Sequence, residues 1–138
     1  MRKHPLADKA SLSGIRRAIR ADLNRVGVDP SLTFDCLVAV TEACTNALTH
    51  SYTGYQEEPW PLVHWEVGGS EARFFVKDYS TRQWSRTSHP SRDIEYLETE
   101  DRVGGFGLEL MRKLMDEVEI SMGPEGTTVC LVKRFRDV

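Results

Sequence analysis

The chain has 138 residues, of which 40% are hydrophobic and 28% charged, and a formal net charge of −3. These values are typical of one soluble globular domain over residues 1–138, and the negative charge disfavours nucleic-acid binding. No apolar run approaches the roughly 20 residues that cross a bilayer, and MRKHPLADKA lacks a signal-peptide apolar region, so we expect a cytoplasmic protein without membrane contact.

The first predicted helix begins with Ser11 or Ser13 as its N-cap and ends at Gly27. Apolar residues recur at helical spacing, namely Leu12, Ile15, Ile19, Leu23 and Val26. The opposite side carries three arginines, Arg16, Arg17 and Arg20. This basic face is either simply solvated or a docking surface for an acidic partner.

A second helix is predicted from Pro30, with Ser31 as its cap. Its core stripe is expected to comprise Phe34, Leu37, Val38, Thr41, Cys44, Leu48 and Tyr52. No Lys or Arg occurs between Pro30 and Tyr52, which is unusual for a helix that lies on a protein surface.

Two strands follow a turn-rich connection. Residues 62–67 alternate, with Val63 on the same side as Trp65, and Gly68-Gly69 indicates a tight hairpin. The returning strand, 72–79, places four residues on one face because successive side chains alternate. They are Ala72, Phe74, Val76 and Asp78.

Residues 80–104 show no sustained period, and a loop of this length is usually a functional lid or a disordered segment; we interpret it as a lid, with a short helix over 93–97 as an option. A third helix is predicted from Gly107, with Leu108, Met111, Leu114, Met115 and Val118 as its buried stripe. Strands are predicted at 117–122 and 127–135, joined by a turn at 123–126. We therefore expect an α+β two-layer sandwich: a mixed, mostly antiparallel sheet with helices on one face.

Cysteine and histidine positions disfavour a disulfide framework or a zinc site. The three cysteines, Cys36, Cys44 and Cys130, lie far apart and form no C-x-x-C pair. We expect reduced thiols in the core. The four histidines are equally scattered, which disfavours a metal site built only from side chains.

Three positions carry candidate chemistry. Glu42, Asn46 and His50 lie on one face of the second helix, where a carboxylate can accept a proton and an amide oxygen can bind Mg²⁺. The alternative is an ordinary, partly exposed helix with incidental polar residues. Asp78 points toward the core at a strand end, unless the strand has already ended and Asp78 is a turn residue.

The third position is VGGFGLEL, residues 103–110, where glycines precede a predicted helix. Glycine lets backbone amides approach a ligand, and a helix N-terminus favours phosphate. Glycines also simply end one element and start another, so this motif alone leaves both readings open.

Taken in order, these motifs resemble the GHKL or Bergerat ATP-binding fold of gyrase, histidine kinases and mismatch-repair ATPases. TEACTNALTHSY is similar to the E-x-x-x-N-A-x-x-H box of its small bacterial branch, the anti-sigma factors that are also serine kinases. VGGFGLELMRKLMDEVEI resembles the second glycine box of that branch, and EGTTVCLVKR resembles its closing Gly-Thr strand.

The resemblance implies ATP and Mg²⁺ as cofactors and a role for each motif residue. Glu42 would be the general base, Asn46 the Mg²⁺ ligand, and Asp78 the reader of the adenine amino group, with support from Thr127. The second glycine box would line the phosphates through Gly105, Phe106, Gly107 and Leu108. His50 fits the box without a definite role.

Two departures from the family pattern stand out. The first glycine box, D-x-G-x-G in the family, is DYSTR here, with Ser80 and Arg82 in place of glycines; Arg82 would either crowd the pocket or reach a phosphate. Relatives begin with a strand used in pairing two copies, whereas no strand is predicted at this N-terminus, so a homodimer stays open.

The resemblance implies a protein that sequesters a sigma factor and phosphorylates a serine of an anti-anti-sigma protein of the STAS type. Arg16, Arg17 and Arg20 are the candidate partner-binding residues. The alternative function is a non-catalytic partner-binding module of the same fold, in which nucleotide binding is weak or lost.

Overall fold

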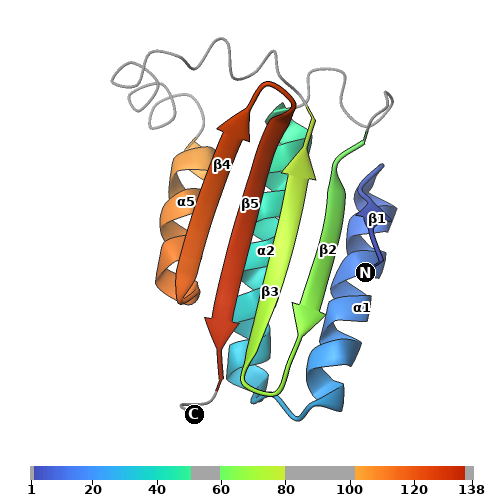
Figure 1. Cartoon of the computed structure of the whole chain (residues 1–138), viewed down its shortest axis with the longest axis vertical. Helices are drawn as coiled ribbons and strands as arrows, with labels where there is room; N and C mark the ends of the chain where they lie inside the picture. The colour runs from blue at the N-terminus through green and yellow to red at the C-terminus, as the bar shows by residue number, and fades with distance from the viewer. Residues whose placement is uncertain (1, 51–59, 80–101, 136–138) are drawn as a thin grey trace.

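The computed structural model describes residues 2–50, 60–79 and 102–135. In these ranges one sheet is covered on one face by helices, and its other face carries no helix (Figure 1). The elements are β1 (His4–Pro5), α1 (Lys9–Arg25), α2 (Pro30–His50), β2 (Leu62–Val67), β3 (Glu71–Asp78), α5 (Arg102–Leu114), β4 (Glu117–Gly123) and β5 (Gly126–Arg134).

The sheet has five strands in the order β1-β2-β3-β5-β4, and each pair of neighbours is antiparallel. The predicted two-layer α+β sandwich is therefore confirmed, and among the described strands no parallel pair is present. β5 inserts between β3 and β4, so it lies inside the sheet, next to the edge strand β4. This insertion brings the start of β5 beside the end of β3.

Strand alternation was predicted correctly. Ala72, Phe74, Val76 and Asp78 are all buried, whereas the residues between them are only partly buried. The buried side of the sheet packs against apolar residues of α1, α2 and α5 in one cluster. The most deeply buried of them include Ile19, Leu23, Leu37, Val40, Met111 and Leu131.

α1 begins earlier than predicted. Asp8, not Ser11 or Ser13, is the N-cap: its Oδ1 accepts a hydrogen bond from the Ser11 backbone N–H at 2.8 Å. This bond satisfies one of the free amides of the first turn. At the other end, Val26 was predicted in the core but is 37% exposed, because the backbone has left the helix at this C-cap position.

α2 runs from Pro30 as predicted, but Asp29 accepts the hydrogen bond from the Ser31 backbone N–H, at 2.9 Å. Phe34, predicted in the core, is 65% exposed and is the main error in this element. Leu37, Cys44 and Leu48 are buried as expected, Val38 and Thr41 only partly, and Tyr52 lies outside the described residues.

A short N-terminal strand is present, contrary to prediction. His4 and Pro5 pair with β2, and the His4 ring stacks on Trp65 with ring centroids 4.6 Å apart. Leu6, the next residue, is fully buried. Two paired residues are too few to show the alternation from which a strand is recognised in a sequence.

α5 starts at Arg102, five residues before the predicted start at Gly107. The glycines therefore lie within the first two turns of the helix, where glycine propensity argued against helix. Met111 and Met115 are buried as predicted, and Leu108 and Leu114 are partly buried against the core. Val118 was predicted in the helix but lies in β4, because α5 ends at Leu114. The expected lid and the optional helix over 93–97 fall mostly in residues 80–101, outside the described ranges.

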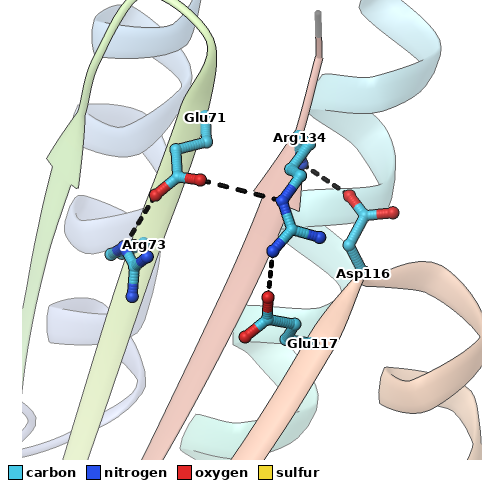
Figure 2. Close-up of polar contacts among 5 residues, drawn as sticks. All are labelled: Glu71, Arg73, Asp116, Glu117 and Arg134. Carbon is cyan, nitrogen blue, oxygen red and sulfur yellow. Dashed lines mark hydrogen bonds and ion pairs between the residues drawn. The ribbon is translucent and has the colours of Figure 1, made fainter. Parts of the chain in front are cut away.

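The helix-free face of the sheet is tied together by charged side chains (Figure 2). Glu71 on β3 accepts from Arg73 at 2.7 Å and lies 3.9 Å from Arg134 on β5. Arg134 also pairs with Glu117 on β4, and its backbone N–H donates to Asp116. These contacts link the three adjacent strands at the end of β5, and solvent exposure limits their contribution to stability.

All three cysteines are free thiols, as expected. Cys36 and Cys44 lie in the core, and burial raises the pKa of each thiol to about 12. Cys130 is only partly buried and lies on β5 rather than in the core. The two core thiols are therefore protonated and unreactive near neutral pH.

Candidate functional site

Four segments that carry the predicted motifs meet at one end of the molecule. The C-terminal half of α2, the end of β3, the start of β5 and the first turns of α5 all lie there (Figure 1). α2 crosses the centre of the sheet, with α5 on one side and α1 on the other. The fold thus collects motifs that are up to 85 residues apart in the sequence.

Gly107 is the point at which α5 contacts the polar face of α2. A Cβ placed on Gly107 would lie 2.8 Å from Glu42 Oε1, 3.5 Å from Asn46 Nδ2 and 3.8 Å from Asn46 Oδ1. The carboxylate and the amide therefore both rest against this buried backbone. A side chain at position 107 would displace the Glu42 carboxylate, so glycine permits the observed approach.

Glu42 and Asn46 remain partly exposed although most of α2 around them is buried. Their neighbours Ala39, Ala43 and Ala47 are between 0% and 5% exposed, so small residues let other elements pack closely against this part of α2. A carboxylate and an amide one turn apart, held beside the start of a helix, can act together on a polar ligand.

Asp78 and Thr127 form the second half of the site. They are directly paired across β3 and β5, and they are 7% and 5% exposed. The prediction that Asp78 faces inward at the strand end is confirmed, and the turn alternative is excluded. Thr127 Oγ1 is buried without a hydrogen-bond partner among the described residues. Such an atom is costly unless a ligand or water bonds it.

Gly126 allows the start of β5 to lie close to the end of β3. It was not identified from the sequence as a site residue. Its φ is +128°, and a Cβ there would lie 1.9 Å from the backbone oxygen of Asp78. No other residue type fits this contact. The signal that could have found it is the glycine directly before Thr127 in EGTT.

Several predicted site residues have no described side chain. Gly105 and Phe106 lie in α5 by their backbone, and His50 is the last residue of α2. Arg82 lies outside the described residues. Leu108 is partly buried against the core.

The three arginines of α1, Arg16, Arg17 and Arg20, are exposed. The basic face predicted from the sequence is therefore present, and its role is a separate question.

Comparison with known proteins identifies the family. A sequence profile described as the histidine kinase-like ATPase domain matches residues 6–133. The chain belongs to the histidine kinase-like ATPase family. Within the residues that the structure describes, no helix of this ATPase domain is long and apolar enough to cross a membrane.

Curated relatives of this ATPase domain are named serine-protein kinase RsbW. The protein from Bacillus pumilus (strain SAFR-032) is 32% identical over 123 residues, covering 86% of this chain and 75% of the relative. The protein from Bacillus subtilis (strain 168) is 32% identical over 128 residues with the same coverage. That from Staphylococcus aureus is 30% identical and covers 99% of this chain and 86% of the relative.

A solved structure of the RsbU and RsbW domains of a Mycobacterium tuberculosis protein shares the fold. It matches the whole chain of this ATPase domain with a TM-score of 0.68 at 22% sequence identity. The match covers 34% of that longer chain, about a third of its length. The family profile and the curated relatives confirm the resemblance to the serine-kinase branch of the GHKL fold, and this structure confirms the fold.

Proposed function

We propose that this chain is an ATP-dependent protein serine kinase that also sequesters a sigma factor, with a STAS-type anti-anti-sigma protein as its substrate. The observation that carries the proposal is the contact of Gly107 with both Glu42 and Asn46, at the same end of the fold as Asp78 and Thr127. Relatives named serine-protein kinase RsbW support it.

Glu42 is proposed as the general base. Its carboxylate is partly exposed and faces the first turns of α5, so an incoming serine hydroxyl can reach it. The carboxylate would accept the hydroxyl proton as the oxygen attacks phosphorus. Phosphoryl transfer depends mostly on positioning, and the contact with Gly107 restricts where the carboxylate can lie.

Asn46 is proposed to hold Mg²⁺. Among the described residues no group of three His, Cys, Asp or Glu side chains is placed to bind a metal ion. An amide oxygen supplemented by phosphate oxygens and water suits Mg²⁺, which prefers oxygen ligands and keeps several waters. When bound, the ion would offset phosphate charge.

Asp78 and Thr127 are proposed to bind adenine. The buried Thr127 hydroxyl has an unused hydrogen-bonding capacity, and the Asp78 carboxylate lies directly across the strand pair from it. A carboxylate accepts a hydrogen bond from the exocyclic amino group of adenine, and the hydroxyl can donate to or accept from the ring. The donor and acceptor set therefore fits this base.

The remaining roles are proposed by position. Gly105, Phe106, Gly107 and Leu108 would line the phosphates. Of these, Gly105 lies in the first turn of α5, whose free N–H groups favour negative charge. His50 and Arg82 stay candidate nucleotide contacts. Arg16, Arg17 and Arg20 form an exposed basic surface suited to an acidic partner.

The proposed activity belongs in the cytoplasm, where sigma factors act. A homodimer also stays a proposal. The short strand β1 pairs with β2 of its own chain and forms one edge of the sheet, and this edge is where a second copy is proposed to pair.

A second candidate function is a partner-binding module without catalysis. The departure DYSTR favours it, because Ser80 and Arg82 stand where relatives have glycines. The packing of the Glu42 and Asn46 side chains against the buried Gly107 favours the kinase. A module that only binds a partner does not need a carboxylate and an amide held together in this way.

The Glu42→Ala variant separates these functions. Because Glu42 would act on the serine hydroxyl and not on the nucleotide, the variant should bind Mg-ATP within about threefold of wild type and lose transfer by about 100-fold or more. The measurements are calorimetric titration with Mg-ATP and transfer of labelled phosphate to the STAS-type proteins of the source organism. Equal loss of both activities would contradict the assignment of Glu42 as base.

A further inference from the structure

The outward face of α2 has an unusual composition for a surface. It consists of Phe34, Val38, Thr41 and Thr45, and Phe34 is 65% exposed. No Lys or Arg occurs in the whole of α2, whereas exposed helix faces ordinarily mix charges of both signs. The Thr41 hydroxyl donates to the Leu37 carbonyl of its own helix at 2.7 Å, so its polar group is already bonded. The outward face of α2 is therefore uncharged and largely apolar.

The contacts of α2 show that this face is directed away from the fold. Glu42 and Asn46 contact α5, and on the same side Asp35 lies 3.5 Å from Lys133 of β5. Leu37 and Val40 are buried toward the sheet and α1. At 100° per residue, Phe34, Val38 and Thr45 fall between these two sides and point outward.

Basic side chains flank the face on the α1 side. In α1, Asp22 accepts a hydrogen bond from Trp65 of β2 at 2.8 Å, which marks the side facing β2. Around the circumference of α1, Ile15 and Ile19 lie next to Asp22 and are buried. Arg16 and Arg20 lie beyond them, on the side nearest α2. The apolar face therefore has a positively charged border.

The face also leads to the proposed catalytic base. With a rise of about 1.5 Å per residue, Val38 lies about 6 Å and Phe34 about 12 Å along α2 from Glu42. The proposed base is therefore within about 12 Å, along the helix axis, of the apolar residues of this face.

We propose that the outward face of α2 is the docking surface for the substrate protein of the kinase, with Phe34 as its apolar anchor. The matching surface is an apolar pocket bordered by carboxylates, which pair with Arg16 and Arg20, and it carries the acceptor serine at its edge. Exposed aromatic residues near a charged border are the usual anchors of such interfaces. This inference rests on the proposed kinase function.

The test compares wild type with a Phe34→Gln, Val38→Gln double variant. Gln keeps helix propensity and removes the apolar anchor, and Phe34 is too exposed to be needed for folding. Glu119→Gln is the control, because Glu119 is exposed and pairs with Cys130 on β5, so it lies on the helix-free face of the sheet, away from α2.

The measurement is phosphorylation kinetics with the STAS-type protein that wild type phosphorylates, together with Mg-ATP titration and sedimentation of the kinase alone. We expect the double variant to raise the KM for the protein substrate about 30-fold, with Mg-ATP affinity and kcat unchanged. The control should match wild type.

Three outcomes would overturn the docking surface. Unchanged KM in the double variant would do so while leaving the kinase function intact. A changed sedimentation coefficient of the variant kinase alone would assign the face to a second copy of this chain. A wild type that binds Mg-ATP but neither binds nor phosphorylates any of the STAS-type proteins would contradict the proposed function and this inference together.

Discussion

Gly107 is the residue through which two helices share one site. Its missing side chain leaves room for the Glu42 carboxylate and the Asn46 amide on the same backbone. Glycine costs a helix about 1 kcal/mol relative to alanine, so its place inside α5 needs a reason other than helix stability. The contact with Glu42 and Asn46 supplies one.

Gly107→Ala should therefore separate activity from stability. The new Cβ would meet the far end of a flexible side chain, Glu42 Oε1, so the carboxylate would be displaced while the fold persists. We expect phosphoryl transfer to fall about 100-fold and the free energy of unfolding to be unchanged or higher. Gly14→Ala in α1, where a Cβ meets nothing within 4 Å, is the control and should keep full transfer. Loss of stability parallel to activity would show a merely structural glycine.

Thr127→Val tests the buried hydroxyl. Valine has nearly the same shape, and Thr127 Oγ1 has no partner among the described residues, so stability should stay equal or rise by about 1 kcal/mol. The affinity for Mg-ATP should fall about tenfold, because the hydroxyl is proposed to bond the base. Thr128→Val, one residue along β5 on the other face, should alter neither quantity by as much. An unchanged nucleotide affinity would remove Thr127 from the site.

For single residues, the alternation of side chains along a strand was the reliable predictor of burial. Asp78 was predicted to face inward because Phe74 and Val76 precede it at spacings of two, and it does. Phe34 was wrongly assigned to the core, because helical spacing alone cannot say how wide the buried stripe of a helix is. The close contacts of Gly107 and Gly126 depend on elements distant in sequence and could not be derived from local pattern.

Among the elements, α1 and β2 are joined by a partly buried polar contact. Trp65 of β2 donates its indole N–H to Asp22 at 2.8 Å, and Asp22 also pairs with Arg25 at 2.5 Å. The bond from Trp65, then that from Arg25, lowers the pKa of the Asp22 carboxyl below 3.8. Its His4 neighbour stacks on the same Trp65 ring, so β1 is held at this point as well.

The pH dependence follows from the sign of that shift. A carboxyl whose pKa is lower in the folded state stabilises the fold above its unfolded pKa, near 3.8, and loses this contribution as pH falls through the folded value. Asp22→Asn should cost about 0.5–1 kcal/mol at pH 7, allowing for partial exposure, and little below pH 3. Urea unfolding followed by tryptophan fluorescence at both pH values measures this. An equal loss of unfolding free energy at both pH values would rule out the ionised carboxylate as the cause.

Element boundaries were predicted less well than element types. The caps of α1 and α2 proved to be Asp8 and Asp29, although serines nearby were chosen, because aspartate and serine satisfy free amides about equally well. The start of α5 was missed because its glycines disfavour helix locally, whereas tertiary contact with α2 stabilises it. The strand β1 is too short to carry a pattern.

For the whole molecule, the order of elements was enough to predict an antiparallel sheet with helices on one face. The position of β5 between β3 and β4 could not be predicted, because strand order depends on packing between segments distant in sequence. That order pairs Asp78 with Thr127 and so completes the candidate nucleotide site. The motifs were recognised singly from the sequence; only the fold places them at one end.

The central claim is that this end of the molecule binds ATP through Asp78. The most direct test is calorimetric titration of Mg-ATP and Mg-GTP into wild type and Asp78→Ala, with circular dichroism as the check of folding. We predict that wild type binds Mg-ATP and not Mg-GTP, since guanine lacks the amino group at the position Asp78 reads, and that Asp78→Ala loses at least about tenfold in ATP affinity. A folded wild type that binds no Mg-ATP, or an Asp78→Ala variant that binds it equally well, would contradict the account.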